Sequence, residues 1–509
     1  MAVVNGARHT PSEATEPVRL EVHHSPNVAQ AVLLGSAAGQ LLLALLITIY
    51  LARVLSPAAF GFFSLLGTIF ILARKFLDLG FGNVAARDVA RDARRERPIL
   101  EGLMAYRRVA GVALAVGMAI FAFVQKDAAE RTVLLAVGAV LLFTEPAALD
   151  PVFQVRQAQG GPALLNLAGG LLVLGGSVVF KRLGLAGAVF GWLLVLREAV
   201  YLLFTKILAE RLLGYHPRPG FRGRALRAFV GPALIFGLAS LVYTIYFHCD
   251  VFFVYALRGK DELGAYAAAF RPVNPLLLLP WVLMMPLIPV LSALAPKDMA
   301  GFVRQVRGAC ALALGLGTSG AVAGIALAPD LVELLYHGRY LYQPLSCVNA
   351  FRWLALALGE VCVTTVLTAS LLAIGKEKLL LAIGTAALIV NATMNLILLQ
   401  SYNFTAAGFA TAATELLYLV SAVVAFQAVT RHSALSWGAL ANLLPAMAMA
   451  AILKFTPGGP VLRVACGVLL GVIAAALILL SPAAKRFRKE LAANSGAPEP
   501  EIQPVMIDA

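Results

Sequence analysis

The sequence predicts an all-α polytopic membrane protein, and three observations carry this prediction. Hydrophobic residues make up 60% of the 509-residue chain and charged residues only 13%, whereas soluble domains carry about a quarter charged residues. Apolar runs of about 20 residues, long enough to cross a bilayer as a helix, recur along the chain. Lysine and arginine gather in alternate connecting segments. The net charge of +14 therefore reflects membrane topology, and we expect no nucleic-acid partner.

About fourteen transmembrane helices are expected, with ends placed to within about four residues. The even number puts both termini on one side of the membrane. The apolar runs lie at 28–50, 58–83, 103–124, 132–153, 163–180, 185–208, 230–257, 265–294, 306–327, 346–374, 378–400, 405–427, 438–455 and 461–481.

Basic residues in the connecting segments predict which side this is. About 26 lysines and arginines fall on one face and about 10 on the other, a bias that sets orientation in membranes. We therefore expect a multi-pass protein of the inner (cytoplasmic) membrane with both termini in the cytoplasm. The segments densest in positive charge are 87–98, 209–229, 295–308 and 485–490.

The widest basic segment divides the helices into two groups of six and a final pair. We expect a cytoplasmic linker at 209–229, and loops of this Pro-, Gly- and Arg-rich composition are typical linkers. The predicted units are an N-lobe at 28–208, a C-lobe at 230–427 and two last helices within 438–481. The polar tail at 1–27 is expected to be a disordered cytoplasmic tail, and 482–509 a second cytoplasmic tail.

The turn after the first apolar run has a weak echo at the start of the second group. The stretch IYLARVLSPAAFGFFSL (49–65) matches VYALRGKDELGAYAAAF (254–270), with Gly61 and Gly264 at corresponding positions. Copies separated by six helices face the same way, as in transporters whose repeats share an axis along the membrane normal. We interpret each copy as a structural corner, with Arg53 of the first reaching the lipid head groups.

The corners and the residues after them resemble the signatures of the polysaccharide transporter (oligosaccharide flippase) family. The first signature reads ARVLSPAAFG and then DLGFGNVAARD (52–61 and 78–88); the second reads ELGAYAAAFR and then PVLS (262–271 and 289–292). The resemblance implies membership of the multidrug/oligosaccharidyl-lipid/polysaccharide exporter superfamily. It also implies two six-helix lobes in a V around a central cavity, and transport by alternating access.

A lipid-linked oligosaccharide cannot flip alone, because each unpaired polar group in hydrocarbon costs several kcal/mol. A carrier must offer a hydrated, cationic cavity, so basic residues inside spans are candidate substrate ligands. The candidates are Arg74, Lys75, Arg271 and Arg352. For the first two, snorkelling near the inner leaflet is an alternative, as is an Arg74 ion pair with Asp78 four residues on. For Arg271 the alternative is an ion pair with Asp250, which lies at similar depth in the preceding run.

Acidic residues inside the spans are candidates for a coupling-ion site or for structural ion pairs. A lone buried carboxylate tends to be neutral and can then exchange a proton or sodium ion. Hydrogen bonding to a neighbouring helix is the alternative, above all for Glu415, which stands alone in its run. The five candidates are Asp78, Glu145, Asp250, Glu360 and Glu415.

The sequence thus predicts a flippase for lipid-linked oligosaccharide of the polyprenyl-pyrophosphate type, serving cell-surface polysaccharide or exopolysaccharide synthesis. We expect a monomer without cofactor or metal, in contact with membrane lipids and with polymerases and glycosyltransferases as pathway partners. A lipid II flippase typically carries charged positions in its first helix. That alternative is disfavoured, because the first run here, 28–50, has no charge. A cation-coupled drug exporter would call for an acidic cavity. A membrane-embedded glycosyltransferase is a remote alternative that rests on Glu333 and His337, because catalytic motifs are absent.

Overall fold

The structure is a computed structural model that describes residues 26–495, apart from 157, 221–222, 278–279, 281–283, 285–286, 296 and 436. Every regular element in that part of the chain is a helix, which confirms the predicted all-α class. The α-helices are α1 (Pro26–Val54), α2 (Pro57–Asp78), α3 (Phe81–Arg91), α4 (Glu96–Val124), α5 (Ala128–Leu141), α6 (Asp150–Val155), α7 (Gly160–Arg182), α8 (Gly191–Leu213), α9 (Gly223–Arg258), α10 (Lys260–Val273), α12 (Leu287–Leu294), α13 (Met299–Ala326), α14 (Ala328–Tyr336), α15 (Val348–Ala373), α16 (Glu377–Ser401), α17 (Thr405–Thr430), α18 (Leu444–Phe455), α19 (Pro460–Leu480) and α20 (Pro482–Ser495).

Eleven of these helical segments are long and apolar enough to cross a membrane. The count becomes twelve when α5 and the bent stretch Glu145–Val155 are taken as one span with a 41° bend. The described apolar part of α1, Ala38–Val54, is shorter than the others, and the predicted span at 265–294 includes residues outside the described ranges. The structure therefore supports a polytopic membrane protein, while the count of fourteen stays a prediction.

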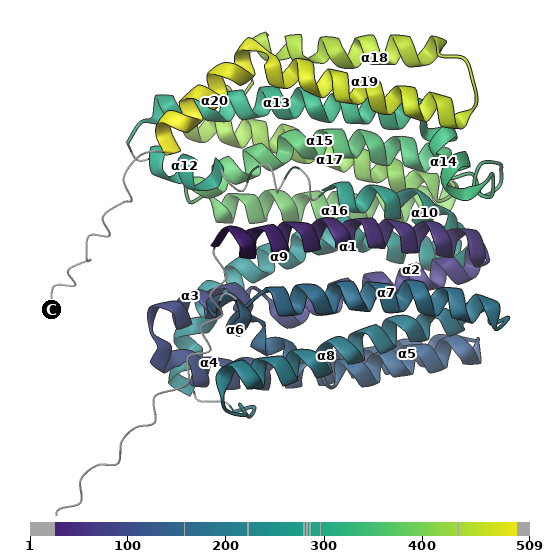
Figure 1. The fold of residues 1–509 in the computed structure, drawn as a ribbon, viewed down its shortest axis with the longest axis vertical. Helices are drawn as coiled ribbons and strands as arrows, with labels where there is room; N and C mark the ends of the chain where they lie inside the picture. Colours follow the sequence, from purple (N-terminus) through teal and green to yellow (C-terminus); the bar gives the residue numbers. More distant parts are fainter. Residues whose placement is uncertain are drawn as a thin grey trace, which may run out of the picture.

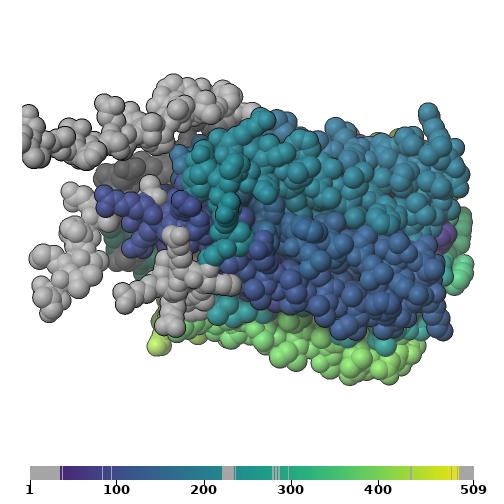
Figure 2. Space-filling view, turned by 90° about the horizontal axis from the view of Figure 1, so that it is seen from below, coloured from purple at the N-terminus to yellow at the C-terminus, as the bar shows by residue number. Residues whose placement is uncertain are grey.

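The helices lie side by side in one elongated stack (Figure 1). Helices α3–α8 gather at the bottom of the stack and α13–α20 at the top, with α1, α2, α9 and α10 between them (Figure 1). We call the part before Gly214 the first half and the part after it the second half. Seen from below, the blue and teal helices of the first half form the near face, with green helices of the second half along one edge (Figure 2). The expected lobe boundaries remain a prediction.

The segments that connect the helices lie along the two sides of the stack, where the helices begin and end. Helices α3, α12 and α20 lie on the left side in Figure 1. We call this side the basic end, because the predicted basic segments belong to it. Helix α14 lies at the opposite end, together with the junction of α1 and α2 (Figure 1). The structure thus separates the two sets of loops as the charge pattern predicts, while the assignment of the basic end to the cytoplasm stays a prediction.

The apolar core joins the halves at the opposite end. Its largest cluster combines Leu55 and Phe62 of the first half with Tyr266 and Tyr336 of the second. Toward the basic end, buried side chains form one cluster within the first half, from Leu79 to Ala209, and a separate one within the second half. The first and second halves therefore pack against each other mainly at the opposite end.

Local capping explains where α2 begins and ends. Ser56 precedes the helix and its Oγ accepts a hydrogen bond from the Ala59 amide at 3.2 Å, while Pro57 occupies the first turn. The expected span at 58–83 was too long, because Leu79 adopts a left-handed φ of 38° and ends the helix after Asp78. Glycine follows at position 80 with φ 73°, and α3 starts in a new direction.

The expected linker at 209–229 is mostly helical. Helix α8 continues to Leu213 and α9 begins at Gly223, so the described non-helical connection is 214–220. The amide of Gly220 donates to the Glu101 carbonyl oxygen at 3.1 Å. The Arg97 guanidinium lies over the Tyr215 ring, 5.4 Å from its centroid. The connection is therefore docked on α4, and burial raises the pKa of Tyr215 to about 12.

Candidate functional site

A polar cavity of about 290 Å³ lies between α1, α2, α7, α8 and α10. Three arginines and one carboxylate line it among aromatic and aliphatic side chains. Arg74 comes from α2, Arg197 and Glu198 come from α8, and Arg271 reaches in from the second half. Two of the four predicted cavity cations thus meet in one cavity.

Arg74 is held by a carboxylate on another helix. Its Nε donates to a Glu198 oxygen at 3.1 Å and a second guanidinium nitrogen donates to the other oxygen. The guanidinium also lies 5.0 Å from the centroid of the Tyr201 ring. The Arg74–Asp78 ion pair considered from the sequence is wrong, because Asp78 instead pairs with Arg107 at 3.6 Å. Helical spacing cannot foresee a partner on another helix.

Arg271 is the cavity cation that ties the halves together. Its Nε donates to Ser64 Oγ at 3.0 Å and a terminal nitrogen donates to the Ser64 carbonyl oxygen at 2.5 Å. A Cβ at position 67 would lie 2.8 Å from the same guanidinium, so Gly67 leaves room for it. The alternative ion pair with Asp250 is wrong, because that carboxylate accepts hydrogen bonds from the Tyr266 hydroxyl and the Val251 amide.

The charges in the cavity do not balance. Three guanidinium groups face a single carboxylate, that of Glu198, which leaves two positive charges uncompensated by residues that line the cavity. Arg271 has only the neutral Ser64 as hydrogen-bond partner in the described part of the chain. A buried cation without a carboxylate is costly, and an anionic ligand would relieve that cost. The cavity is therefore suited to an anion.

The other two predicted cations lie outside this cavity. Lys75 is exposed and donates to Ser240 Oγ on α9 at 3.1 Å. Arg352 is also exposed and donates to the Asn349 side chain at 3.1 Å, and its guanidinium does not meet Glu360. These residues share a helix with predicted site residues, but they point away from the cavity that collects Arg74 and Arg271.

The acidic candidates are distributed over both halves. In the first half, Glu145 pairs with Arg108 and Asp78 with Arg107, so both are members of ion pairs. In the second half, Glu415 is 2% exposed and borders a small cavity lined by threonines and tyrosines, and one Glu360 oxygen is buried without a hydrogen-bond partner. No cluster of three metal-ligating acids, histidines or cysteines occurs within the described residues.

Neutral polar groups surround Glu415. The Tyr246 hydroxyl donates to Thr414 Oγ1 at 3.2 Å, and the Asn391 amide donates to the same oxygen at 3.0 Å. The Asn395 amide continues the chain by donating to Asn391 Oδ1 at 2.9 Å. These contacts join α9, α16 and α17, so neutral hydrogen bonds hold the interior of the second half beside Glu415.

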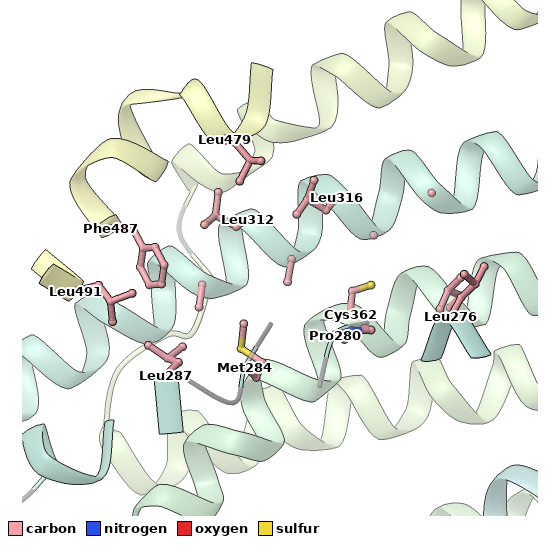
Figure 3. Close-up of a pocket in the computed structure, with 15 residues that line it drawn as sticks. Leu276, Pro280, Met284, Leu287, Leu312, Leu316, Cys362, Leu479, Phe487 and Leu491 are labelled. Carbon is pink, nitrogen blue, oxygen red and sulfur yellow. The ribbon is translucent and has the colours of Figure 1, made fainter. Parts of the chain in front are cut away.

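An apolar groove of about 490 Å³ lies in the second half. Phe487 and Leu491 of α20 border one end of it, while Leu276 lies toward the other (Figure 3). Its walls come from α13, α15 and α19, and nearly every lining atom belongs to an aliphatic or aromatic side chain (Figure 3). The groove has the shape and chemistry to accept a hydrocarbon chain.

The two residues on which the glycosyltransferase alternative rested lie on the surface. Glu333 and His337 are both exposed at the opposite end. Helix α14 ends at Tyr336, and His337 turns away with a left-handed φ of 50°. The spacing of four residues had indicated that the two side chains share one helical face. They do not, because the helix ends between them.

Sequence reasoning did not commit to three residues that complete the cavity. Arg197, Glu198 and Ser64 all face it or contact its arginines. The adjacent Arg197 and Glu198 inside an apolar run were a usable signal, because two charges in a span rarely lie in lipid. Ser64 gave no such signal, since a serine in a membrane helix usually bonds its own backbone.

Comparison with known proteins identifies the family and the fold. The family described as polysaccharide biosynthesis protein matches residues 30–295. A structure of a lipid II flippase, MurJ, in an inward closed conformation has a TM-score of 0.68 and 12% sequence identity. The similarity covers 89% of this chain and 99% of that one. No curated protein matches by sequence.

A second solved structure has the same architecture. It is an inward-facing multidrug resistance MATE family transporter of the MOP superfamily, with a TM-score of 0.52 and 16% identity. The similarity covers 77% of this chain and 96% of that chain. At these identities the two structures show a shared fold. Because the family match spans more than half of the sequence, the chain belongs to the polysaccharide biosynthesis protein family.

Proposed function

We propose that the protein is a flippase that moves lipid-linked oligosaccharide of the polyprenyl-pyrophosphate type across the cytoplasmic membrane. The observation that carries the proposal is the pair of uncompensated cations, Arg197 and Arg271, in a cavity between membrane helices. A diphosphate supplies two or more negative charges, which matches this excess. Arginine is also well suited to phosphate, because its planar fork of donors matches the phosphate oxygens.

The apolar groove supports the same proposal from the lipid side. A polyprenyl tail needs an apolar path beside the polar cavity, because its carbons lose hydrophobic stabilisation in water. The groove between α13, α15 and α19 offers such a surface (Figure 3). Pro275 lines the cavity and the next residue, Leu276, lines the groove, so both border the short helical stretch Asn274–Leu277. A ligand with a charged head and a hydrocarbon tail fits both.

Net transport against a substrate gradient also needs an energy source, and we assign this role to the second half. Glu415 and Glu360 lie within the polar core there, and a carboxylate in such surroundings can exchange a proton or a small cation. The first-half acids are engaged with arginines. The proposed coupling site is therefore Glu415 with its neighbours, while Asp250 serves to anchor Tyr266.

The proposed setting follows from topology. Both termini would lie in the cytoplasm, where glycosyltransferases make the substrate, and a polymerase would receive it on the other side. We propose that a single chain is sufficient, since the cavity is formed within one chain. No covalent step is needed, and the two solved structures that share the fold are those of a flippase and a transporter, which supports the proposal.

The experiment that tests this function is reconstitution into liposomes. A fluorescent, short-chain polyprenyl-diphosphate oligosaccharide is placed in both leaflets, and its accessibility to an impermeant quencher is followed with time. We expect protein-dependent exchange that is competed by undecaprenyl diphosphate and not by the uncharged alcohol. Exchange that is absent for every diphosphate-linked glycan would contradict the proposal.

Two alternatives of the same superfamily are separated by the same assay. A lipid II flippase is favoured by the fold it shares with the MurJ structure, and it predicts exchange of lipid II in preference to other glycans. A drug exporter is disfavoured, because the excess of arginine would repel the cations that such transporters commonly carry. Efflux of cationic dyes without glycan exchange would favour it instead.

A further inference from the structure

The opposite end of the molecule holds a pair of arginines that bind backbone in place of carboxylates. Arg53 is at the last turn of α1 in the first half, and Arg339 lies three residues beyond α14 in the second half. In membrane transporters such ends must open and close, so contacts that cross between the halves there are of particular interest.

Each arginine caps the helix of the other half. Arg53 Nε donates to the Leu335 carbonyl oxygen at 2.6 Å, and a terminal nitrogen donates to the Leu334 oxygen at 2.9 Å. In return, Arg339 donates from one terminal nitrogen to the carbonyl oxygens of Ala52 at 3.2 Å and Arg53 at 2.7 Å. The arrangement is reciprocal.

The four acceptors are carbonyls that their own helices leave free. The last four carbonyls of a helix have no partner within it and carry its negative dipole end. In α14 the Glu333 oxygen is used by the His337 amide, and in α1 the Leu51 oxygen is used by the Leu55 amide. The next two carbonyls of each helix are those that the arginines bind.

A tight backbone contact lies beside this pair. A Cβ at Gly61 of α2 would come within 2.2 Å of the Lys260 carbonyl oxygen on α10. A Cβ at Gly264 would come within 2.0 Å of the Pro57 carbonyl oxygen on α2. The corresponding glycines of the two corners therefore pack each corner against the other, and the arginine pair is one of several contacts at this end, which include the Lys260–Glu130 ion pair between the halves.

We propose that Arg53 and Arg339 form a latch that holds the opposite end closed and that must release before this end opens. The inference rests on the proposed function in one respect: the transport cycle must include a state in which the opposite end is open. Both side chains reach water, so water can replace the protein as hydrogen-bond partner once the halves part. Neither arginine forms an ion pair with an acidic side chain in the described part of the chain, so the strength of the latch depends on helix dipoles rather than on a carboxylate.

The experiment measures the width of the opposite end directly. Spin labels are placed at Lys126Cys and Tyr402Cys, exposed positions at this end of the first and second halves, in a background with the five native cysteines replaced. Distances are recorded in nanodiscs for wild type, Arg53→Gln, Arg339→Gln and the double variant. We expect the ratio of long to short distances to rise about tenfold in each single variant.

Arg258→Gln is the matched control. This arginine is at the same end but pairs with Glu262 of its own half at 2.7 Å, so its loss should leave the distances unchanged. Arg339→Lys guards against misfolding, because a lysine keeps the charge but has a single donor nitrogen in place of the guanidinium fork, so it should give an intermediate ratio. Retention of a single symmetrical size-exclusion peak shows that each variant is folded.

The latch and the proposed function can fail separately. Wild-type distances in both glutamine variants and in the double variant would overturn the latch, whatever the liposome assay shows. A shift to longer distances supports the latch even if no diphosphate-linked glycan is exchanged, in which case only the transported substrate would need revision.

Discussion

The two halves of the molecule satisfy their buried polar groups in different ways. The first half uses ion pairs between helices, including Arg74 with Glu198 and Arg107 with Asp78. The second half also has an ion pair between helices, Arg463 with Asp330 at 3.0 Å, but beside Glu415 it uses neutral hydrogen bonds, such as those that Thr414 receives from Tyr246 and Asn391. The charged cavity of the first half and the neutral surroundings of Glu415 are expected to respond to different ligands.

This difference separates two tasks. A network of arginines and one carboxylate can be rearranged by an arriving anion, because the anion competes for the same guanidinium donors. A network of hydroxyls, amides and a single carboxylate offers oxygen atoms to a proton or a small cation. We therefore expect changes in the first half to alter substrate handling and changes in the second half to alter coupling.

The largest effect is expected at Arg271, the cavity cation whose hydrogen bonds within the described residues go to Ser64 alone. Arg271→Ala should lower the rate of diphosphate-glycan exchange on the order of 100-fold, because charge-assisted phosphate contacts are lost. Arg352→Ala is the control, since this arginine is exposed and lies outside the cavity. Equal rates for the two variants would contradict the assignment of the cavity.

A smaller effect is expected when the carboxylate of the first half is removed. Glu198→Gln leaves Arg74 without its ion-pair partner, which should cost about 1–3 kcal/mol of stability and lower the Tm in detergent. The freed guanidinium should also bind the substrate diphosphate more tightly, so exchange slows at release. Thermal unfolding and exchange rates measured at several substrate densities check both statements. An unchanged Tm would show that the pair adds nothing to the fold.

The second half should show the opposite pattern. Glu415→Gln should keep the affinity for the diphosphate glycan within about twofold, while it removes any acceleration of exchange by an imposed proton or sodium gradient. The measurement compares exchange with and without the gradient in the same liposomes. If the variant loses substrate binding and keeps the gradient effect, the division of tasks between the halves is wrong.

The smallest effect is expected at Lys75, whose exposed ammonium donates to Ser240 across the halves near the basic end. Lys75→Ala should change exchange less than about twofold, since exposed hydrogen bonds and ion pairs contribute little. A tenfold loss in this variant would mean that the lysine enters the substrate path in another state. The same liposome assay gives the answer.

Much of the fold could be predicted from apolar runs, because a span needs about 20 apolar residues whatever its neighbours are. The first corner was also predictable, since Ser56 and Pro57 are local capping signals. The turn at Leu79 was missed, because a leucine in the left-handed conformation has no sequence signature. The span at 265–294 could not be checked as one helix, since several of its residues lie outside the described ranges.

The candidate site was predicted only in part, for a physical reason. Charges in spans mark a polar interior, and this principle found Arg74 and Arg271. It could not tell which neighbours they would meet, because partners such as Glu198 and Ser64 come from other helices. Lys75 and Arg352 show the converse, since a charge within an apolar run can also point outward to water or head groups.

The contact between the two corner glycines also bears on how the protein is made. Gly61 leaves the ribosome about 200 residues before Gly264, which is roughly 10–40 s at 5–20 residues per second. During that time the first corner has no second corner to pack against. The first half therefore waits in the membrane with an open seam on α2, and synthesis of α10 closes it. Assembly of this end is thus a late event, timed by translation.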